Sequence, residues 1–191
     1  MFTRFVSPLL VLAIFLLFGS KAAEAQLIVW SSANGGNDHA YGLTPFGSWT
    51  SAEAYAVSQG GHLVTIDNAA ENGFIKTNFI SGAGASRDLW IGLESPTGDW
   101  TDPATWVWVS GSTSTYRNWR VGQPDGGFAD GEDDRYAAIN WPLTGDEHWD
   151  NYPNSVYRQP QGIFEVPEPA SLALLIFGAG LVLPRSLSRK H

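Results

Sequence analysis

Carboxylates gather in one part of this sequence. Between positions 125 and 150 the chain has a single basic residue, Arg135, and eight acidic ones: Asp125, Asp130, Glu132, Asp133, Asp134, Asp146, Glu147 and Asp150. Oxygen ligands of this kind suit calcium. The chain has no Cys, and the region has no cluster of His and Cys, which disfavours zinc. Such a cluster can attract a cation, and a solvated acidic surface is the alternative that the carboxylates alone leave open.

The same side chains raise an enzymatic hypothesis. A hydrolase could use Glu132 together with Asp150 or His148 as its acid and base, as in glycoside hydrolysis. Such a pair needs a cleft and neighbours that shift its pKa values, and the sequence shows the carboxylates without an activating neighbour. We therefore predict that the protein is not an enzyme.

Overall charge and composition exclude other functions. The chain has 191 residues, 11 Lys plus Arg against 19 Asp plus Glu, and a formal net charge of −8, so its surface repels nucleic-acid phosphates. The absence of Cys removes disulfides and thiol chemistry. A length of this size fits one domain, and 21 Gly with 9 Trp predict a loop-rich fold held by large aromatic anchors.

The N-terminal residues 1–25 have the pattern of a signal peptide. Arg4 precedes an uncharged run over 5–20, and Ala23-x-Ala25 is a cleavage pattern, which places the mature start at Gln26. An uncleaved membrane anchor is the alternative, but the run is shorter than the ~20 residues that a spanning helix needs.

The C-terminal residues 167–191 have a three-part pattern of their own. Pro167-Glu168-Pro169 is followed by an uncharged run over 170–183 and by a basic tail with Arg185, Arg189 and Lys190. This resembles the PEP-CTERM sorting signal of Gram-negative bacteria, with its transmembrane-like helix. The resemblance implies transient anchoring in the inner membrane, cleavage by an exosortase-type enzyme, and delivery to the cell surface or extracellular matrix. A plain membrane anchor is the alternative.

The domain between these ends, residues 26–166, must position the carboxylates. It keeps six basic and seventeen acidic residues, a net charge near −11. Hydrophobic spacing predicts helices over 52–59, with Thr50 and Ser51 as possible caps, and over 68–79. Strands are expected over 63–66, 89–93, 105–109, 136–140 and 161–166, with a long ordered loop over 116–131 and Trp149 lying between the last two strands.

Motifs spread over about 130 residues identify this domain by resemblance. They are Trp49-x-x-Ala52-x-x-Tyr55, Gly60-Gly61-His62-Leu63-Val64, Glu71-x-x-Phe74, Trp90-Ile91-Gly92-Leu93, Asn118-Trp119, Gln123-Pro124-Asp125, Gly131-Glu132-Asp133 and Trp149-Asp150-Asn151. Their order resembles that of a C-type lectin-like domain. The resemblance implies an α+β fold with two short helices, antiparallel strands and a long ordered loop.

The chain departs from that family in having no disulfides. The places of the two usual disulfides correspond to Ala56 with Phe164, and to residues near Asp134 and Asn154. The tryptophans and a bound cation are expected to offset the loss, which is a few kcal/mol for each crosslink. His62 is expected to be a satisfied turn or core residue and not a ligand.

The resemblance also implies a ligand set. It assigns Ca²⁺ to Gln123, Asp125, Glu132, Asp150 and Asn151, which offer oxygen donors, and it implies a cis Gln123-Pro124 bond. In the family these side chains also hydrogen-bond two sugar hydroxyls. Gln-Pro-Asp resembles galactose-type sites, and Phe128 lies where an aromatic ring would meet the sugar. The Asp150-Asn151 order is inverted relative to the family's usual Asn-Asp, which puts the choice of sugar in doubt more than calcium.

Two binding functions follow from this reading. The first is a secreted, calcium-dependent carbohydrate-binding module that holds exopolysaccharide. The second is a non-enzymatic structural or protein-binding matrix protein of the same fold, which presents Trp100, Trp141 and Phe128 to a partner.

Overall fold

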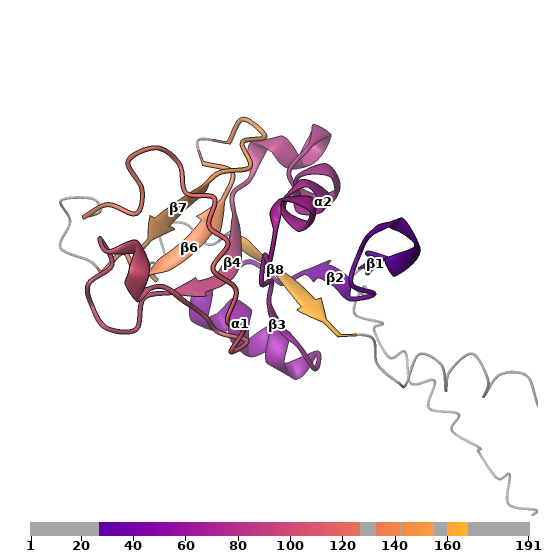
Figure 1. Cartoon of the computed structure of the whole chain (residues 1–191), viewed down its shortest axis with the longest axis horizontal. Helices are drawn as coiled ribbons and strands as arrows, with labels where there is room; N and C mark the ends of the chain where they lie inside the picture. Colours follow the sequence, from indigo (N-terminus) through magenta and orange to yellow (C-terminus); the bar gives the residue numbers. More distant parts are fainter. Residues whose placement is uncertain (1–26, 127–132, 142, 155–159, 168–191) are drawn as a thin grey trace, which may run out of the picture.

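The computed structural model describes residues 27–126, 133–141, 143–154 and 160–167. They form an α+β domain with two α-helices, as the sequence predicted, and a mixed sheet in place of the expected antiparallel one (Figure 1). The helices are α1 (Trp49–Ser58) and α2 (Ala69–Phe79). The strands are β1 (Ile28–Val29), β2 (Ala40–Leu43), β3 (His62–Leu63), β4 (Leu89–Glu94), β5 (Val107–Trp108), β6 (Tyr136–Ile139), β7 (Trp149–Tyr152) and β8 (Gln161–Val166).

The sheet has the strand order β1-β2-β8-β4-β6-β7, with β3 paired to β8 and β5 paired to β4. Its strands pair antiparallel with one exception, the parallel pair β4 and β8. That pair joins the half of the sheet built from the chain ends to the half that carries the acidic region. In Figure 1, α1 and α2 lie on opposite sides of these central strands.

Both helices begin at side-chain caps. The Ser48 side chain accepts a hydrogen bond from the Ser51 N–H at 3.2 Å, so α1 starts at Trp49, three residues before the predicted start. Thr50 and Ser51 therefore lie inside the helix and are not its caps. Asn68 caps α2 by accepting from the N–H groups of Ala70 and Glu71, which agrees with the predicted boundaries.

Two predicted strands are shorter than expected. The strand predicted over 63–66 ends at Leu63, and the Thr65 N–H donates instead to the side chain of Glu165 at 2.7 Å. A 3₁₀ helix, Pro103–Thr105, replaces the start of the strand predicted over 105–109. Two further 3₁₀ helices, Ser32–Asn34 and Gly82–Ser86, together with β1, β2 and β7, were not predicted.

Tryptophans anchor the core, as their number suggested. Trp90, Trp106 and Trp149 are almost completely buried. Their indole N–H groups find acceptors: Trp90 donates to the Gly47 carbonyl, Trp106 to the Trp100 carbonyl and Trp149 to Asn72 Oδ1, each at 3.0 Å. Large apolar area is thus buried without leaving these polar groups unpaired.

The positions that correspond to the usual disulfides are packed in other ways. Ala56 and Phe164 are fully buried on α1 and β8. Asp134 is fully buried, and Asn154 donates to the Thr50 hydroxyl at 3.1 Å. Side-chain packing and hydrogen bonds therefore occupy both places in this cysteine-free chain.

Candidate functional site

The chain after Trp119 makes a tight turn into the predicted ligand tripeptide. The Gln123 N–H donates to the Arg120 carbonyl at 2.9 Å, and Gly122 between them has a φ of 92°, which favours glycine. The Gln123-Pro124 bond is cis, as the resemblance implied, and Pro124 is buried. Gln123 Nε2 donates to Asp125 Oδ2 at 3.1 Å, so both predicted ligands lie together.

Asn151 of β7 holds this tripeptide. The Asp125 N–H donates to Asn151 Oδ1 at 3.0 Å, and Asn151 Nδ2 donates to the carbonyls of Asp125 and Asp134 at 3.1 and 2.9 Å. Asn151 is 2% exposed. Three of the predicted site residues, Gln123, Asp125 and Asn151, are therefore brought into direct contact.

Asp150, the neighbour of Asn151 on β7, lies beside Arg120. Its Oδ1 accepts from the Asn151 N–H at 2.9 Å, and its Oδ2 lies 3.7 Å from Arg120 Nη1. Arg120 Nε lies 3.8 Å from Asp146 Oδ2. Burial alone would raise the pKa of Asp146, but hydrogen bonds with His148 and the charges of His148 and Arg120 hold that pKa below its usual value.

The donor chemistry of these residues fits calcium. Gln123 Oε1 is a buried acceptor with no hydrogen-bond partner among the described residues, and Asp125 and Asp150 add carboxylates. Glu132 and Phe128 lie outside the described residues. Within the described ranges, no group of three or more His, Cys, Asp or Glu residues is arranged to hold a metal. A site here would depend on amide oxygens as well as carboxylates.

Two residues of the hydrolase hypothesis, Asp150 and His148, have contacts within the described residues, while the third, Glu132, lies outside them. Asp150 is 6% exposed and has Arg120 as an ion-pair partner, and His148 Nδ1 is hydrogen-bonded to Asp146 Oδ1. Asp150 is therefore not offered as an open base by the described part of the site, whereas the bond of His148 occupies Nδ1 alone.

His62 is a satisfied turn residue, as expected. Its Nδ1 lies 2.6 Å from Glu53 Oε1, and Glu53 Oε2 accepts from the Leu63 N–H at 2.8 Å. One carboxylate of α1 thus fixes both the ring and the start of β3.

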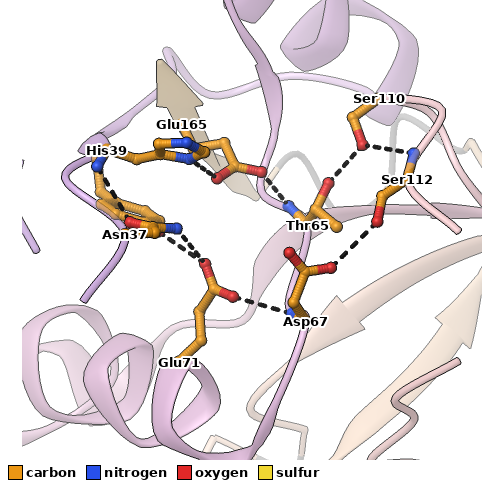
Figure 2. Close-up of polar contacts among 9 residues, drawn as sticks. Asn37, His39, Thr65, Asp67, Glu71, Ser110, Ser112 and Glu165 are labelled. Atoms are coloured by element: carbon orange, nitrogen blue, oxygen red, sulfur yellow. Dashed lines mark hydrogen bonds and ion pairs between the residues drawn. The ribbon is translucent and has the colours of Figure 1, made fainter. Parts of the chain in front are cut away.

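A second polar cluster, which sequence reasoning missed, lies at the other half of the sheet (Figure 2). Glu165 of β8 accepts from the Thr65 N–H and pairs with His39 Nδ1 at 2.8 Å. Glu71 of α2 accepts from the Tyr41 hydroxyl at 2.7 Å and from the Asp67 N–H at 2.9 Å. The signal in the sequence was weak: Glu71 was noted only as part of a framework motif, and His39 belongs to a strand region that was not predicted.

A groove of about 360 Å³ opens beside this cluster. Thr65 and Ser110 share a hydrogen bond of 2.6 Å along it, and Ser112 donates to Asp67 at 3.1 Å (Figure 2). Hydrogen bonds thus join groove residues that are far apart in sequence, Thr65 to Ser110 and Asp67 to Ser112.

Comparisons with known proteins agree with this architecture. Residues 47–155, more than half of the chain, match the family model of the lectin C-type domain. A galactose-specific lectin, nattectin from Thalassophryne nattereri, is 38% identical over 77 residues, which are 40% of this chain and 46% of nattectin. Ladderlectin from Oncorhynchus mykiss is 30% identical over 118 residues, 62% of this chain and 57% of ladderlectin. The matches to these two relatives span about half the length of each.

Among solved structures, human lithostathine is similar in fold. It superposes with a TM-score of 0.59 at 20% sequence identity, and the match covers 74% of this chain and 88% of lithostathine. At this identity the likeness concerns the arrangement of helices and strands alone.

Proposed function

Because the chain belongs to the lectin C-type domain family, we propose that it is an exported, calcium-dependent carbohydrate-binding protein of a bacterial cell surface or exopolysaccharide matrix. The observation that carries this proposal is the set of hydrogen bonds between Asn151 and the loop that holds Gln123 and Asp125. It supports a site built from residues far apart in sequence. The relatives named above are lectins or share the fold, and we propose binding without catalysis.

Five residues would hold the ion: Gln123, Asp125, Glu132, Asp150 and Asn151. Calcium, when bound, would supply open coordination positions for two neighbouring sugar hydroxyls. Gln123 and Asp125 would orient those hydroxyls by hydrogen bonds, because the amide can donate and the carboxylate accepts. Asn151 also fixes the backbone of Asp125 through hydrogen bonds at its oxygen and its nitrogen, and the second lone pair of its Oδ1 would be left for the ion.

We further propose a galactose-type preference. It is supported by the Gln123-Pro124-Asp125 tripeptide and by the similarity to nattectin, a galactose-specific lectin. Phe128 would face the apolar side of the sugar. A single exposed site of this kind binds weakly, near the millimolar range at about −4 kcal/mol, so adhesion would come from many copies displayed together.

A glycan panel tests the proposal. The purified protein is applied with calcium, and again with a chelator, to galactose-type and mannose-type glycans and to the exopolysaccharide of the producing cell. Binding that chelator abolishes is the expected result. Absence of binding to every glycan, with calcium present, would contradict the carbohydrate function.

The alternative is a structural or protein-binding matrix protein that presents Trp100, Trp141 and Phe128 to a partner. The positions of the two tryptophans support it less well than the site geometry supports carbohydrate binding. Trp100 is half-buried against the main core, and Trp141 is half-buried with its ring edge-on to Tyr152 at 6.3 Å. Neither ring is freely presented, while Phe128 lies outside the described residues. Glycan-independent capture of a matrix protein by the purified chain would favour this alternative.

Export and processing are part of the proposal and rest on the sequence of the two ends. None of the helices within the described ranges has the length and hydropathy that a bilayer crossing requires. Residues 1–25 would be removed as a signal peptide, and residues 167–191 would serve as a sorting signal cut by an exosortase-type enzyme. The intact mass of protein from the surface of the producing cell should correspond to a start near Gln26 and an end near Pro167. Recovery of the full 191 residues would contradict it.

A further inference from the structure

Asp150 is a charged side chain in an almost buried position. It is 6% exposed on β7. Removing a carboxylate from water is costly unless cations or hydrogen-bond donors compensate the lost hydration. The backbone N–H of Asn151 donates to one carboxylate oxygen at 2.9 Å, and Arg120 faces the other. Arg120 is thus the positive charge that stands beside a proposed calcium ligand.

The backbone fixes Arg120 in that place. Its N–H donates to the carbonyl of Trp149, the first residue of β7, at 2.9 Å. The Trp149 N–H donates to the Asn118 carbonyl at 2.8 Å, so the segment before the ligand loop runs beside β7. These two backbone bonds fix the backbone of Arg120 beside β7, from where its side chain reaches Asp150.

The side-chain contacts of Arg120 are loose. Nη1 lies 3.7 Å from Asp150 Oδ2 and Nε lies 3.8 Å from Asp146 Oδ2, both longer than hydrogen bonds. Nε and Nη2 are buried and have no hydrogen-bond partner among the described residues. Arg120 therefore compensates charge without forming the close bidentate pair that makes a guanidinium–carboxylate contact strong.

We propose that Arg120 is an internal counter-cation, which neutralises Asp150 in the calcium-free protein and lowers the affinity of the site for calcium. The inference rests on the calcium site of the proposed function. Two of the proposed ligands within the described residues, Asp125 and Asp150, are anionic, and the guanidinium of Arg120 offsets one of these charges. Calcium approaches carboxylate oxygens to about 2.3 to 2.6 Å, closer than Arg120 does, but both cations then share Asp150 and repel each other.

Calcium titration of the full chain by calorimetry tests this role, with unfolding followed in chelator. Arg120→Met keeps an unbranched side chain of similar reach and removes the charge. At about 0.02 M salt the variant is expected to bind calcium about 3- to 10-fold more tightly than the wild type, and at about 0.5 M salt most of this gain should disappear. In chelator its melting temperature should be lower, because a positive charge beside the buried Asp150 has been removed.

Two controls separate this role from general charge effects. Lys76→Met removes one positive charge, as Arg120→Met does. Lys76 pairs with Glu147 at 3.4 Å, and Glu147 is not a proposed ligand. The calcium affinity of the Lys76→Met variant should therefore stay within about two-fold of the wild type. Arg120→Lys retains a cation and should also stay within about two-fold. If Arg120→Met does not fold, Arg120→Gln replaces it.

The outcomes distinguish this inference from the proposed function. If the wild type binds calcium and Arg120→Met binds it equally or more weakly, the role of Arg120 is overturned and the proposed function is not. An equal gain in affinity in Lys76→Met would overturn the role of Arg120 in the same way. A calcium response gained only by Arg120→Met would support it. Absence of calcium binding in both proteins would overturn it together with the calcium dependence of the proposed function.

Discussion

Asn151 and Asp125 are joined by two hydrogen bonds that run in opposite directions. The Asp125 N–H donates to Asn151 Oδ1 at 3.0 Å, and Asn151 Nδ2 donates to the Asp125 carbonyl at 3.1 Å. The same Nδ2 donates to the carbonyl of Asp134. One buried side chain of β7 therefore ties both flanks of the acidic loop to the sheet.

Replacing Asn151 by Ala should destabilise the chain even in chelator. The substitution leaves a backbone N–H and two backbone carbonyls without their side-chain partner, and we expect a loss of about 2 to 4 kcal/mol in the free energy of unfolding. Denaturant unfolding in chelator measures it. Asn154→Ala is the matched control: its hydrogen bonds to Thr50 are exposed, so its loss should stay below about 0.5 kcal/mol. Equal losses would show that the bonds of Asn151 do not stabilise the loop.

The roles of Asp150 and Asn151 illustrate what spacing can and cannot predict. Asp150 and Asn151 are neighbours in one motif, but the structure gives their side chains different partners. Asn151 lies against Asp125, as a shared site requires, while Asp150 lies against Arg120. Arg120 belongs to no recognised motif and is distant in sequence from both partners. Its placement depends on the backbone pairing of residues 118–120 with Trp149, which is a tertiary feature.

The buried carboxyl of Glu71 predicts a pH dependence of stability. Glu71 is 1% exposed, and burial raises its pKa to about 7, with the carboxylates of Glu165 and Asp67 adding to the shift against its hydrogen bonds. The pKa of His39 is also raised, chiefly by its hydrogen bond to Glu165 (Figure 2). In both cases the folded state holds the proton more tightly than the unfolded state. The resulting stabilisation is complete below the unfolded pKa values and is lost as the pH rises through the folded ones.

We expect Glu71→Gln to flatten this profile. Between about pH 5 and pH 8, the free energy of unfolding of the wild type should fall by on the order of 2 kcal/mol more than that of the variant. Chemical denaturation across this range measures the difference. Glu147→Gln, at a partly exposed side chain, controls for the loss of one negative charge. Parallel profiles for wild type and Glu71→Gln would mean that the raised pKa does not contribute to stability.

The polar cluster around Glu71 lies in the part of the fold that the sequence predicted least well. The strand predicted over 63–66 was inferred from its apolar residues, yet the structure uses the Thr65 N–H to bind the Glu165 side chain. β2 was not predicted because Ala40-Tyr41-Gly42-Leu43 is short and contains glycine, and its pairing with β8 joins residues 120 or more positions apart. The helices and the central strand β4 were predicted because their patterns are local.

Calcium should stabilise the folded protein. An ion that binds only the folded state adds about 2.7 kcal/mol when its free concentration is 100 times Kd. Glu132→Gln should weaken the rise in melting temperature more than Asp99→Asn does, because Asp99 is an exposed residue outside the proposed ligand set. Thermal melts with calcium and with chelator measure both. Equal responses would attribute the stabilisation to general charge screening.

The contact between Gln123 and Asp125 provides a test of sugar specificity. Gln123 Nε2 donates to Asp125 Oδ2 at 3.1 Å, so an amide and a carboxylate pair directly. Exchanging them, by Gln123→Glu with Asp125→Asn, keeps one amide and one carboxylate and allows the same bond with the donor and acceptor reversed. Net charge is unchanged, and stability should stay within about 1 kcal/mol of the wild type. The exchange therefore changes mainly where the negative charge faces the ion and the sugar hydroxyls.

If this pair reads the sugar, the wild type should prefer galactose-type ligands in calcium and the exchanged protein should shift toward mannose-type ligands. Only a few hydrogen bonds at an exposed site differ, so the shift should be about 1 to 2 kcal/mol and not a complete reversal. Competition with free galactose and free mannose, measured on both proteins against one immobilised glycan, gives the two rankings. Identical rankings would show that the tripeptide does not select the sugar. The choice would then have to come from elsewhere in the site, with Asp150 the first residue to vary because its position in the motif is inverted.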